Sequence, residues 1–217
     1  MNYLTRGISY IFHPLLVPLL GITFLMYWPS DSKGFFIYDV LYYLPEMNKK
    51  GLMIVIGTLT LMAPAVSVLI LYLSKIITSI HLERREERKM PYALTIFYTI
   101  LAYFILYRAP EDSLSIYVYA AIFGTLISLI ILYLTLSFTK ISAHTTAWGG
   151  FSGFFLAYLM EVKVTYGVEI LCTIILISGI VGGARVYLKS HTASEVYLGF
   201  AIAFVIQFLI THFDWYI

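Results

Sequence analysis

The sequence has few charged residues and a single cysteine. Only 12% of its 217 residues are Asp, Glu, Lys or Arg, and the mean hydropathy is +0.86. A soluble globular domain has about twice this share of charge, so the composition excludes one and indicates an integral membrane protein. Cys172 alone excludes an internal disulfide and any metal site built from several cysteines. The net charge of +2 gives no reason to expect a nucleic acid as partner.

The chain also lacks an internal repeat, a low-complexity tract and a Ser/Gly-rich or Pro-rich linker. We therefore expect residues 1–217 to form a single all-α domain, a polytopic bundle of transmembrane helices. A helix needs about 20 apolar residues to cross the hydrocarbon core. Seven segments reach or approach this length: 8–28, 52–74, 92–108, 114–138, 146–161, 166–183 and 195–212. The third and fifth are short, so the sequence predicts seven spans, with six as the alternative.

The first segment, 8–28, is longer than a signal-peptide core and has no small-residue cleavage pattern. We expect it to be retained, with Met1 as the mature N-terminus. Pro14 and Pro18 are expected to kink it. Residues 29–50 carry tyrosines among scattered charges, a pattern typical of the membrane interface.

Four connections carry almost all of the polar residues that can take part in chemistry, and three of them matter most here, at 75–91, 139–145 and 184–194. Two predicted spans separate each connection from the next. Seven spans would therefore place all three connections at the same face of the membrane. Arg88, His144 and His191 are expected to meet there.

The last of these connections leads to His191 and Glu195, which are four residues apart. On one helix face the carboxylate can hold one imidazole N–H and leave the other ring nitrogen free to attack. Arg185 would then bind the anion under attack. The structural alternative is an ordinary helix start, with Arg185 and Lys189 reaching to lipid headgroups.

The connection at 139–145 carries Ser142 and His144 before a segment rich in small residues. A helix that begins near Ser142 would direct its free N–H groups toward an anion beside His144. The alternative reading makes Ser142 an N-cap and His144 an interfacial histidine. The glycines that follow are expected to allow close helix packing; they are Gly149, Gly150 and Gly153.

The connection at 75–91 carries Arg84, Arg85 and Arg88, which would form one basic ridge on a helix. The alternative is a solvated, salt-bridged segment that fixes topology. In combination, the three connections supply what a phosphate site requires: cations for the nonbridging oxygens, one histidine to attack phosphorus and another to protonate the leaving oxygen.

The remaining histidines carry less weight. His13 is expected to be a packed or hydrogen-bonded structural residue, and His81 and His212 are expected at the interface. Only Glu195 is placed to join His144 and His191, so a metal site is not expected.

These residues resemble the signature of the phosphatidic acid phosphatase type 2 superfamily of membrane phosphatases: Lys-x6-Arg-Pro, Pro-Ser-Gly-His and Ser-Arg-x5-His-x3-Asp. The third part matches best. Arg185, His191 and Glu195 keep its spacing, with Ala184 in place of serine and glutamate in place of aspartate.

The other two parts are degenerate. Residues 141–144 read Ile-Ser-Ala-His, which keeps the serine and the histidine of the second part. In the first part, Met90 stands at the arginine position and Glu83 at the lysine position. Arg88 or Lys89, displaced by one or two residues, would serve instead.

The resemblance implies a metal-independent phosphatase without cofactors, which acts on a lipid mono- or diphosphate through a phosphohistidine intermediate. His191 would be the nucleophile and Glu195 its orienting carboxylate. His144 would protonate the leaving oxygen and then activate water. The phosphoryl group would be held by Arg185, Arg88, Lys89 and Ser142.

Two alternatives stay open: a non-hydrolytic member that binds lipid headgroups or assists transport, and a phosphotransferase that passes the phosphoryl group to another lipid. The expected partners are membrane lipids and a phosphorylated lipid substrate. Candidates are phosphatidylglycerol phosphate, a polyprenyl diphosphate, phosphatidic acid and phosphorylated lipid A. The sequence makes no prediction of oligomeric state.

The resemblance also implies a multi-pass protein of the bacterial inner membrane. Bacterial members of the superfamily commonly act on the outer face of that membrane, whereas the positive-inside rule favours the cytoplasm for the motif face. That face would carry nine of the basic residues: Arg6, Lys75, Arg84, Arg85, Arg88, Lys89, Lys140, Arg185 and Lys189. The opposite face would carry five: Lys33, Lys49, Lys50, Arg108 and Lys163.

Overall fold

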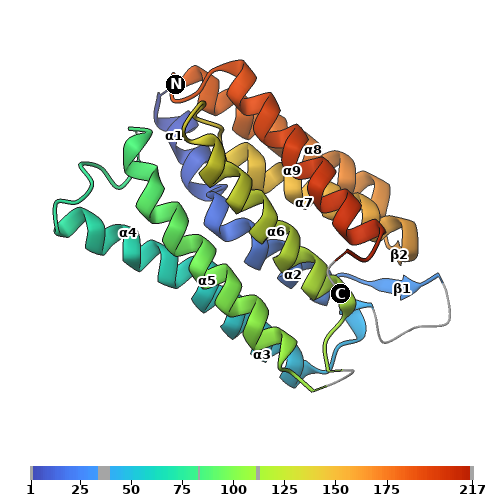
Figure 1. Cartoon of the computed structure of the whole chain (residues 1–217). Coiled ribbons are helices and arrows are strands. Elements are labelled where there is room, and N and C mark those ends of the chain that lie inside the picture. The colour runs from blue at the N-terminus through green and yellow to red at the C-terminus, as the bar shows by residue number, and fades with distance from the viewer. Residues whose placement is uncertain (1, 34–39, 83, 111–112, 216–217) are drawn as a thin grey trace.

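The computed structural model describes residues 2–33, 40–82, 84–110 and 113–215 as a bundle of long helices with one short strand pair (Figure 1). The α-helices are α1 (Asn2–Ile11), α2 (Val17–Tyr27), α3 (Glu46–Ile56), α4 (Ala63–Leu73), α5 (Lys89–Tyr107), α6 (Ile116–Thr135), α7 (Ala143–Glu161), α8 (Gly167–Tyr187) and α9 (Ala193–His212). The shorter elements are η1 (Pro14–Leu16), η3 (Leu41–Tyr43), the π-helical η4 (Gly57–Met62), η5 (Glu86–Arg88), β1 (Ser30–Ser32) and β2 (Val162–Val164). The expected all-α polytopic bundle is confirmed.

The first two spans are interrupted where proline removes a backbone donor. At Pro14 the chain leaves α1, makes the short helix η1 and continues as α2, so the predicted kink is present. In the second span, Pro64 cannot donate to the carbonyl of Thr60, and α3 and α4 are joined through the π-helical turn η4.

Six helical segments in the described chain have the length and apolar composition of a membrane span: Tyr3–Tyr27, Glu46–Leu73, Glu86–Tyr107, Ile116–Thr135, Gly167–Tyr187 and Ala193–His212. A multi-pass membrane protein follows from these helices. The first three begin five or six residues earlier than predicted, at Tyr3, Glu46 and Glu86 instead of residues 8, 52 and 92. The segment 29–50 is thus only partly as expected, since Ser30–Ser32 pairs with Val162–Val164 and α3 begins at Glu46, while residues 34–39 lie outside the described chain.

Helix α7 is the seventh long segment, and it coincides with the predicted fifth span. It has 19 residues and runs beside α8 and α9 through the bundle (Figure 1). It is less apolar than the other long helices, and residues along its whole length are buried, from Thr145 to Tyr158, so its polar groups do not face lipid. The connections before α5, α7 and α9 lie at one end of the bundle with the N-terminus, as the seven-span reading requires (Figure 1).

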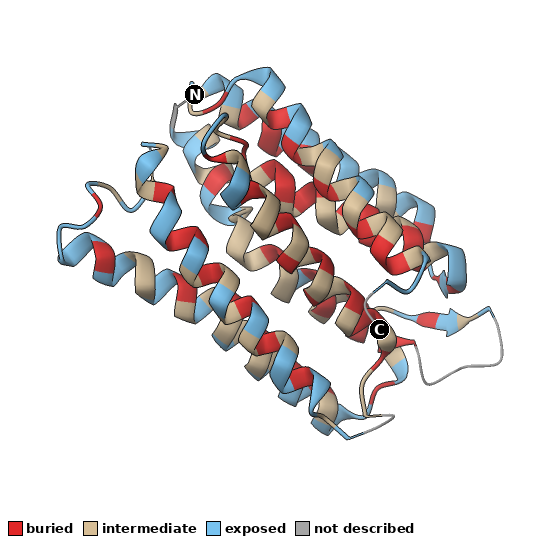
Figure 2. Ribbon diagram, in the orientation of Figure 1, coloured by how far each residue is buried: buried red, intermediate tan, exposed pale blue. Residues whose placement is uncertain are grey.

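Buried residues lie on the helix sides that face one another (Figure 2). The most deeply buried side chains include Leu25, Leu52, Ile122, Phe155 and Tyr158. The outward sides carry exposed apolar residues, which is the expected surface of a bundle whose solvent is lipid. Leu69, Phe97 and Leu176 are examples.

Close packing of α7 on α9 depends on two of the predicted glycines. A Cβ atom added at Gly149 would collide with the carbonyl oxygen of Phe200, and one added at Gly153 with that of Phe204. Small residues let membrane helices approach until their backbones touch. Backbone contact therefore holds α7 and α9 together, and both helices begin at the polar end of the bundle.

We predict that Gly153→Ala destabilises the protein by about 1–3 kcal/mol, because its methyl group forces α7 away from the backbone of α9. Thermal unfolding in detergent, followed by circular dichroism, measures the effect. The matched control is Gly179→Ala, since Gly179 is an exposed α8 residue whose added Cβ would meet nothing within 4 Å. Equal melting temperatures for the two variants would contradict this packing.

Candidate functional site

A cavity of about 800 Å³ opens among the helices at the end of the bundle where the three polar connections lie. Residues from α1, α5, α7 and α8 and from the connection before α9 contribute to its wall. Its basic lining residues are Arg6, Arg88, Lys140, Arg185 and Lys189. No Asp or Glu of the described chain lines it. The cavity therefore favours an anion.

His191 occupies a short turn that the local sequence specifies closely. After α8 ends, Lys189 adopts a left-handed conformation with φ of 52°, and the N–H groups of Ser190 and His191 return to the carbonyl of Arg185. Thr192 then caps α9 by accepting from the N–H of Glu195 at 3.3 Å. The Glu195 carboxylate accepts from the N–H of Thr192 at 3.0 Å, which completes a capping box.

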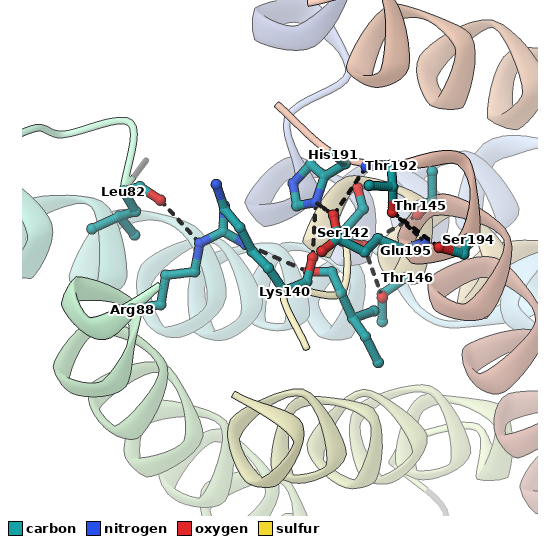
Figure 3. Close-up of polar contacts among 11 residues, drawn as sticks. Leu82, Arg88, Lys140, Ser142, Thr145, Thr146, His191, Thr192, Ser194 and Glu195 are labelled. Atoms are coloured by element: carbon teal, nitrogen blue, oxygen red, sulfur yellow. Dashed lines mark hydrogen bonds and ion pairs between the residues drawn. The ribbon is translucent and has the colours of Figure 1, made fainter. Parts of the chain in front are cut away.

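The same Glu195 carboxylate oxygen also holds His191. Nδ1 of His191 lies 3.2 Å from Oε2 of Glu195 and 2.9 Å from the backbone carbonyl of Lys140 (Figure 3). Both partners are hydrogen-bond acceptors, so Nδ1 carries the proton and donates it. In the neutral ring Nε2 then keeps its lone pair, and His191 lines the cavity. The predicted pairing of His191 with Glu195 is present.

Burial and two arginines keep His191 neutral. Its side chain is 1% exposed. Burial, followed by the positive charges of Arg88 and Arg185, holds its pKa below the usual value for histidine, and these effects outweigh the opposing ones of the Lys140 carbonyl and Glu195. A neutral imidazole with a free Nε2 is the form that can act as a nucleophile.

The two arginines are held by neutral groups, so their charge remains available. Arg88 is buried and donates from Nε to the carbonyl of Leu82 at 2.9 Å and from Nη1 to that of Ile141 at 3.5 Å (Figure 3). Arg185 donates from Nη1 to Oγ of Ser9 at 3.4 Å. Its Nε is buried without a hydrogen-bond partner among the described residues. Neither arginine forms a salt bridge within the described chain.

His144 lies in the first turn of α7 and lines the same cavity. Its Nε2 is 3.1 Å from the carbonyl of Ser9, which only accepts, so this nitrogen carries a proton. Nδ1 is then the ring nitrogen that can gain and release a proton. The ring of His13 stands edge-on to it, with centroids 5.6 Å apart.

Helix α1 was not predicted to belong to the site, yet it forms one wall. Arg6, Ser9 and Tyr10 of α1 line the cavity, and so does His13, which follows α1 and caps η1. His13 has the expected structural role, since Nδ1 accepts from the N–H of Leu15 at 3.4 Å, but it also faces His144. The sequence held one signal that this segment belongs to the site. Pro14, which follows His13, interrupts the first span, and an interrupted helix leaves backbone polar groups without partners inside a membrane.

Two predicted phosphate-binding residues lie elsewhere. Lys89 is exposed at the start of α5 and does not line the cavity, whereas its neighbour Arg88 does. Ser142 is fully buried outside the lining, with no hydrogen-bond partner for its Oγ in the described residues. Its backbone N–H donates to the carbonyl of Glu195 at 3.2 Å. Glu83, at the lysine position of the first motif, lies outside the described residues.

Taken together, the site contains a buried imidazole nitrogen with a free lone pair, a second histidine with one ring nitrogen able to gain a proton, and two arginines that form no salt bridge within the described residues. The described residues contain no group of three His, Cys, Asp or Glu side chains that could hold a metal ion. Comparison of the chain with family models, curated proteins and solved structures finds no significant match in any of the three.

We predict that Arg88→Gln raises the pKa of His191, because removal of a nearby cation stabilises the imidazolium form. Histidine signals of isotope-labelled protein, followed by NMR across a pH titration, measure this. Arg84→Gln is the control, since Arg84 is exposed and does not line the cavity. An unchanged titration of His191 in Arg88→Gln would contradict the electrostatic role of Arg88.

Proposed function

We propose that the protein is a membrane phosphatase of the phosphatidic acid phosphatase type 2 kind, which hydrolyses phosphorylated lipids through a phosphohistidine. The observation that carries this proposal is the hydrogen bonding of His191. Its Nδ1–H is directed to two acceptors, which leaves Nε2 as a nucleophile in a cavity lined by two arginines that form no salt bridge in the described chain.

In the first step Arg88 and Arg185 neutralise the nonbridging oxygens of the phosphoryl group. Nε2 of His191 attacks phosphorus as the bond to the lipid oxygen breaks. This step requires His144 to be protonated on both ring nitrogens, a form that the negative charge of the bound phosphate would stabilise; it gives the Nδ1 proton to that oxygen, and the lipid leaves as an alcohol. Glu195 stabilises the positive charge that the His191 ring gains, since its carboxylate accepts from Nδ1–H.

In the second step water replaces the histidine on phosphorus. Neutral His144 takes a proton from the water through Nδ1 as the oxygen attacks, and the bond from phosphorus to Nε2 of His191 breaks. Phosphate leaves, and both histidines return to their starting forms. None of these steps needs a metal ion or a cofactor.

The course of the cavity supports a lipid as the substrate. Away from the cations, its wall continues between the spans with apolar residues that include Val17, Ile22, Val68, Leu129 and Phe151. A phosphate ester held between the arginines can extend a hydrocarbon chain into this region without exposing it to water.

We also propose that the protein belongs to a bacterial inner membrane, in line with the superfamily that its motifs resemble. The basic residues of the motif face have a local reason to be there, since five of them line the cavity. Their excess over the opposite face is therefore weak support for a cytoplasmic orientation.

We predict that purified protein releases phosphate from lipid phosphates in the presence of excess chelator. His191→Ala lowers this activity to background because it removes the nucleophile, and His144→Ala lowers it about 10²–10⁴-fold because it removes the general acid. A colorimetric phosphate assay on a panel of lipid mono- and diphosphates measures both effects.

His212→Ala is the matched control, since His212 lies at the far end of α9 and does not line the cavity. It should keep full activity. Full turnover by His191→Ala would refute the phosphohistidine mechanism. Failure to hydrolyse any lipid phosphate would favour a headgroup-binding or transport-assisting role.

A further inference from the structure

A third histidine lines the cavity beside His144. His13 lies between α1 and η1, and it is only partly buried. Its ring stands edge-on to that of His144, with 5.6 Å between the centroids and 75° between the planes. Two imidazoles at this separation can both form a hydrogen bond to one small group. The motifs that assign roles to His144 and His191 assign none to His13.

The backbone fixes which nitrogen of His13 carries the proton. Nδ1 of His13 lies 3.4 Å from the backbone nitrogen of Leu15, which can only donate, so Nδ1 is the acceptor. In the neutral ring the proton is therefore on Nε2. Within the described residues Nε2 has no hydrogen-bond partner, yet it is not enclosed by protein atoms. His13 thus presents an N–H donor to the cavity.

Capping of η1 does not explain why this residue is a histidine. Asn, Asp and Ser are the residues preferred at an N-cap. The contact with Leu15, at 3.4 Å, is longer than a typical N–H hydrogen bond. A serine could cap the turn with a smaller side chain. What the imidazole adds is the second ring nitrogen.

Ser9 connects this pair of histidines to the phosphate-binding arginine. Its carbonyl accepts from Nε2 of His144 at 3.1 Å, so Nδ1 of His144 has a free lone pair in the neutral ring. Its Oγ accepts from Nη1 of Arg185 at 3.4 Å. The donor of His13 and the acceptor of His144 therefore lie beside the group that would hold the phosphate.

A donor next to an acceptor selects the kind of oxygen that fits between them. Nε2–H of His13 requires an acceptor, and Nδ1 of neutral His144 requires a donor. Water and an alcohol hydroxyl can satisfy both nitrogens. A nonbridging phosphoryl oxygen can satisfy only the first. The pair is therefore suited to the oxygen that enters or leaves phosphorus.

We infer that His13 is a further catalytic residue, which holds the oxygen with which His144 exchanges a proton. This inference rests on the proposed function and adds a residue to its mechanism. In the first step Nε2–H of His13 donates to the lipid oxygen while His144 gives that oxygen a proton. The negative charge that develops on the leaving oxygen is stabilised by this donor.

In the second step water takes the place of the departed alcohol. The water oxygen accepts from Nε2–H of His13 and gives one proton to Nδ1 of His144. Its lone pair attacks phosphorus as the bond from phosphorus to Nε2 of His191 breaks. His13 keeps its own proton in both steps, so it acts as a fixed donor.

The test is His13→Ser, because the serine hydroxyl can still accept from the N–H of Leu15 and cap η1. With a lipid phosphate, kcat should fall about tenfold, within the range carried by one hydrogen bond. The probe p-nitrophenyl phosphate separates the two steps, since nitrophenolate leaves without being protonated. Phosphorylation of His191 should stay fast and attack by water should slow, so phosphohistidine should accumulate above the wild-type level.

Alkaline quenching and mass spectrometry measure the phosphohistidine. His81→Ser is the matched control, because His81 also lines the cavity but its ring contacts Tyr10, with centroids 5.9 Å apart. It should keep the wild-type kcat and phosphohistidine level. Wild-type behaviour of His13→Ser, or a lower kcat without accumulation of phosphohistidine, would overturn the inference.

Histidine NMR of isotope-labelled protein separates failure of this inference from failure of the proposed function. It uses inorganic phosphate, the reaction product, and needs no turnover. Saturating phosphate should move the Nε2–H proton signal of His13 downfield, because a phosphate oxygen accepts from it. An unmoved signal would overturn the inference even if lipid phosphates are hydrolysed. A moved signal in a protein that hydrolyses none of them would refute the phosphatase and leave His13 as an anion-binding donor.

Discussion

The site depends on one carboxylate. Glu195 accepts from the N–H of Thr192 to start α9, and the same oxygen accepts from Nδ1 of His191. The cap that fixes where the helix begins therefore also fixes which nitrogen of the imidazole carries the proton. A glutamate at this position fits this double role, because its side chain is long enough to complete the capping box.

A membrane setting explains why the basic residues collect as they do. Arg88 and Arg185 are held by carbonyl and hydroxyl oxygens, without a salt bridge in the described chain. Buried cations without counterions are costly unless an anion occupies the site. Burial and the proximity of these two cations lower the pKa of His191, so the charges that would bind an anion also favour the neutral imidazole.

Much of the bundle was predictable because long apolar runs allow few structures in a membrane. The order of the long helices, the kink at Pro14 and the pairing of His191 with Glu195 follow from hydropathy and from spacing along single helices. Helix α7 was harder to assign as a span from hydropathy. Neighbouring helices cover it, so its surface does not have to be apolar.

Contacts between distant segments were not predictable from local patterns. Nothing in the sequence near Ser9 indicates that its carbonyl holds His144 and its hydroxyl meets Arg185. The choice between Arg88 and Lys89 likewise depends on how the turn before α5 sits against the bundle, which buries the first and exposes the second. Ser142 was predicted at the phosphate from motif order, but packing of α7 on α9 encloses it.

The most direct test of the mechanism is the position of the phosphoryl group on a trapped intermediate. The protein would be mixed with a lipid phosphate, quenched at alkaline pH, at which phosphohistidine survives, and analysed by mass spectrometry and phosphorus NMR. The hydrogen bonds of Nδ1 predict phosphorylation of His191 on Nε2. Phosphorylation on Nδ1 or on His144, or turnover without any phosphorylated histidine, would contradict the mechanism.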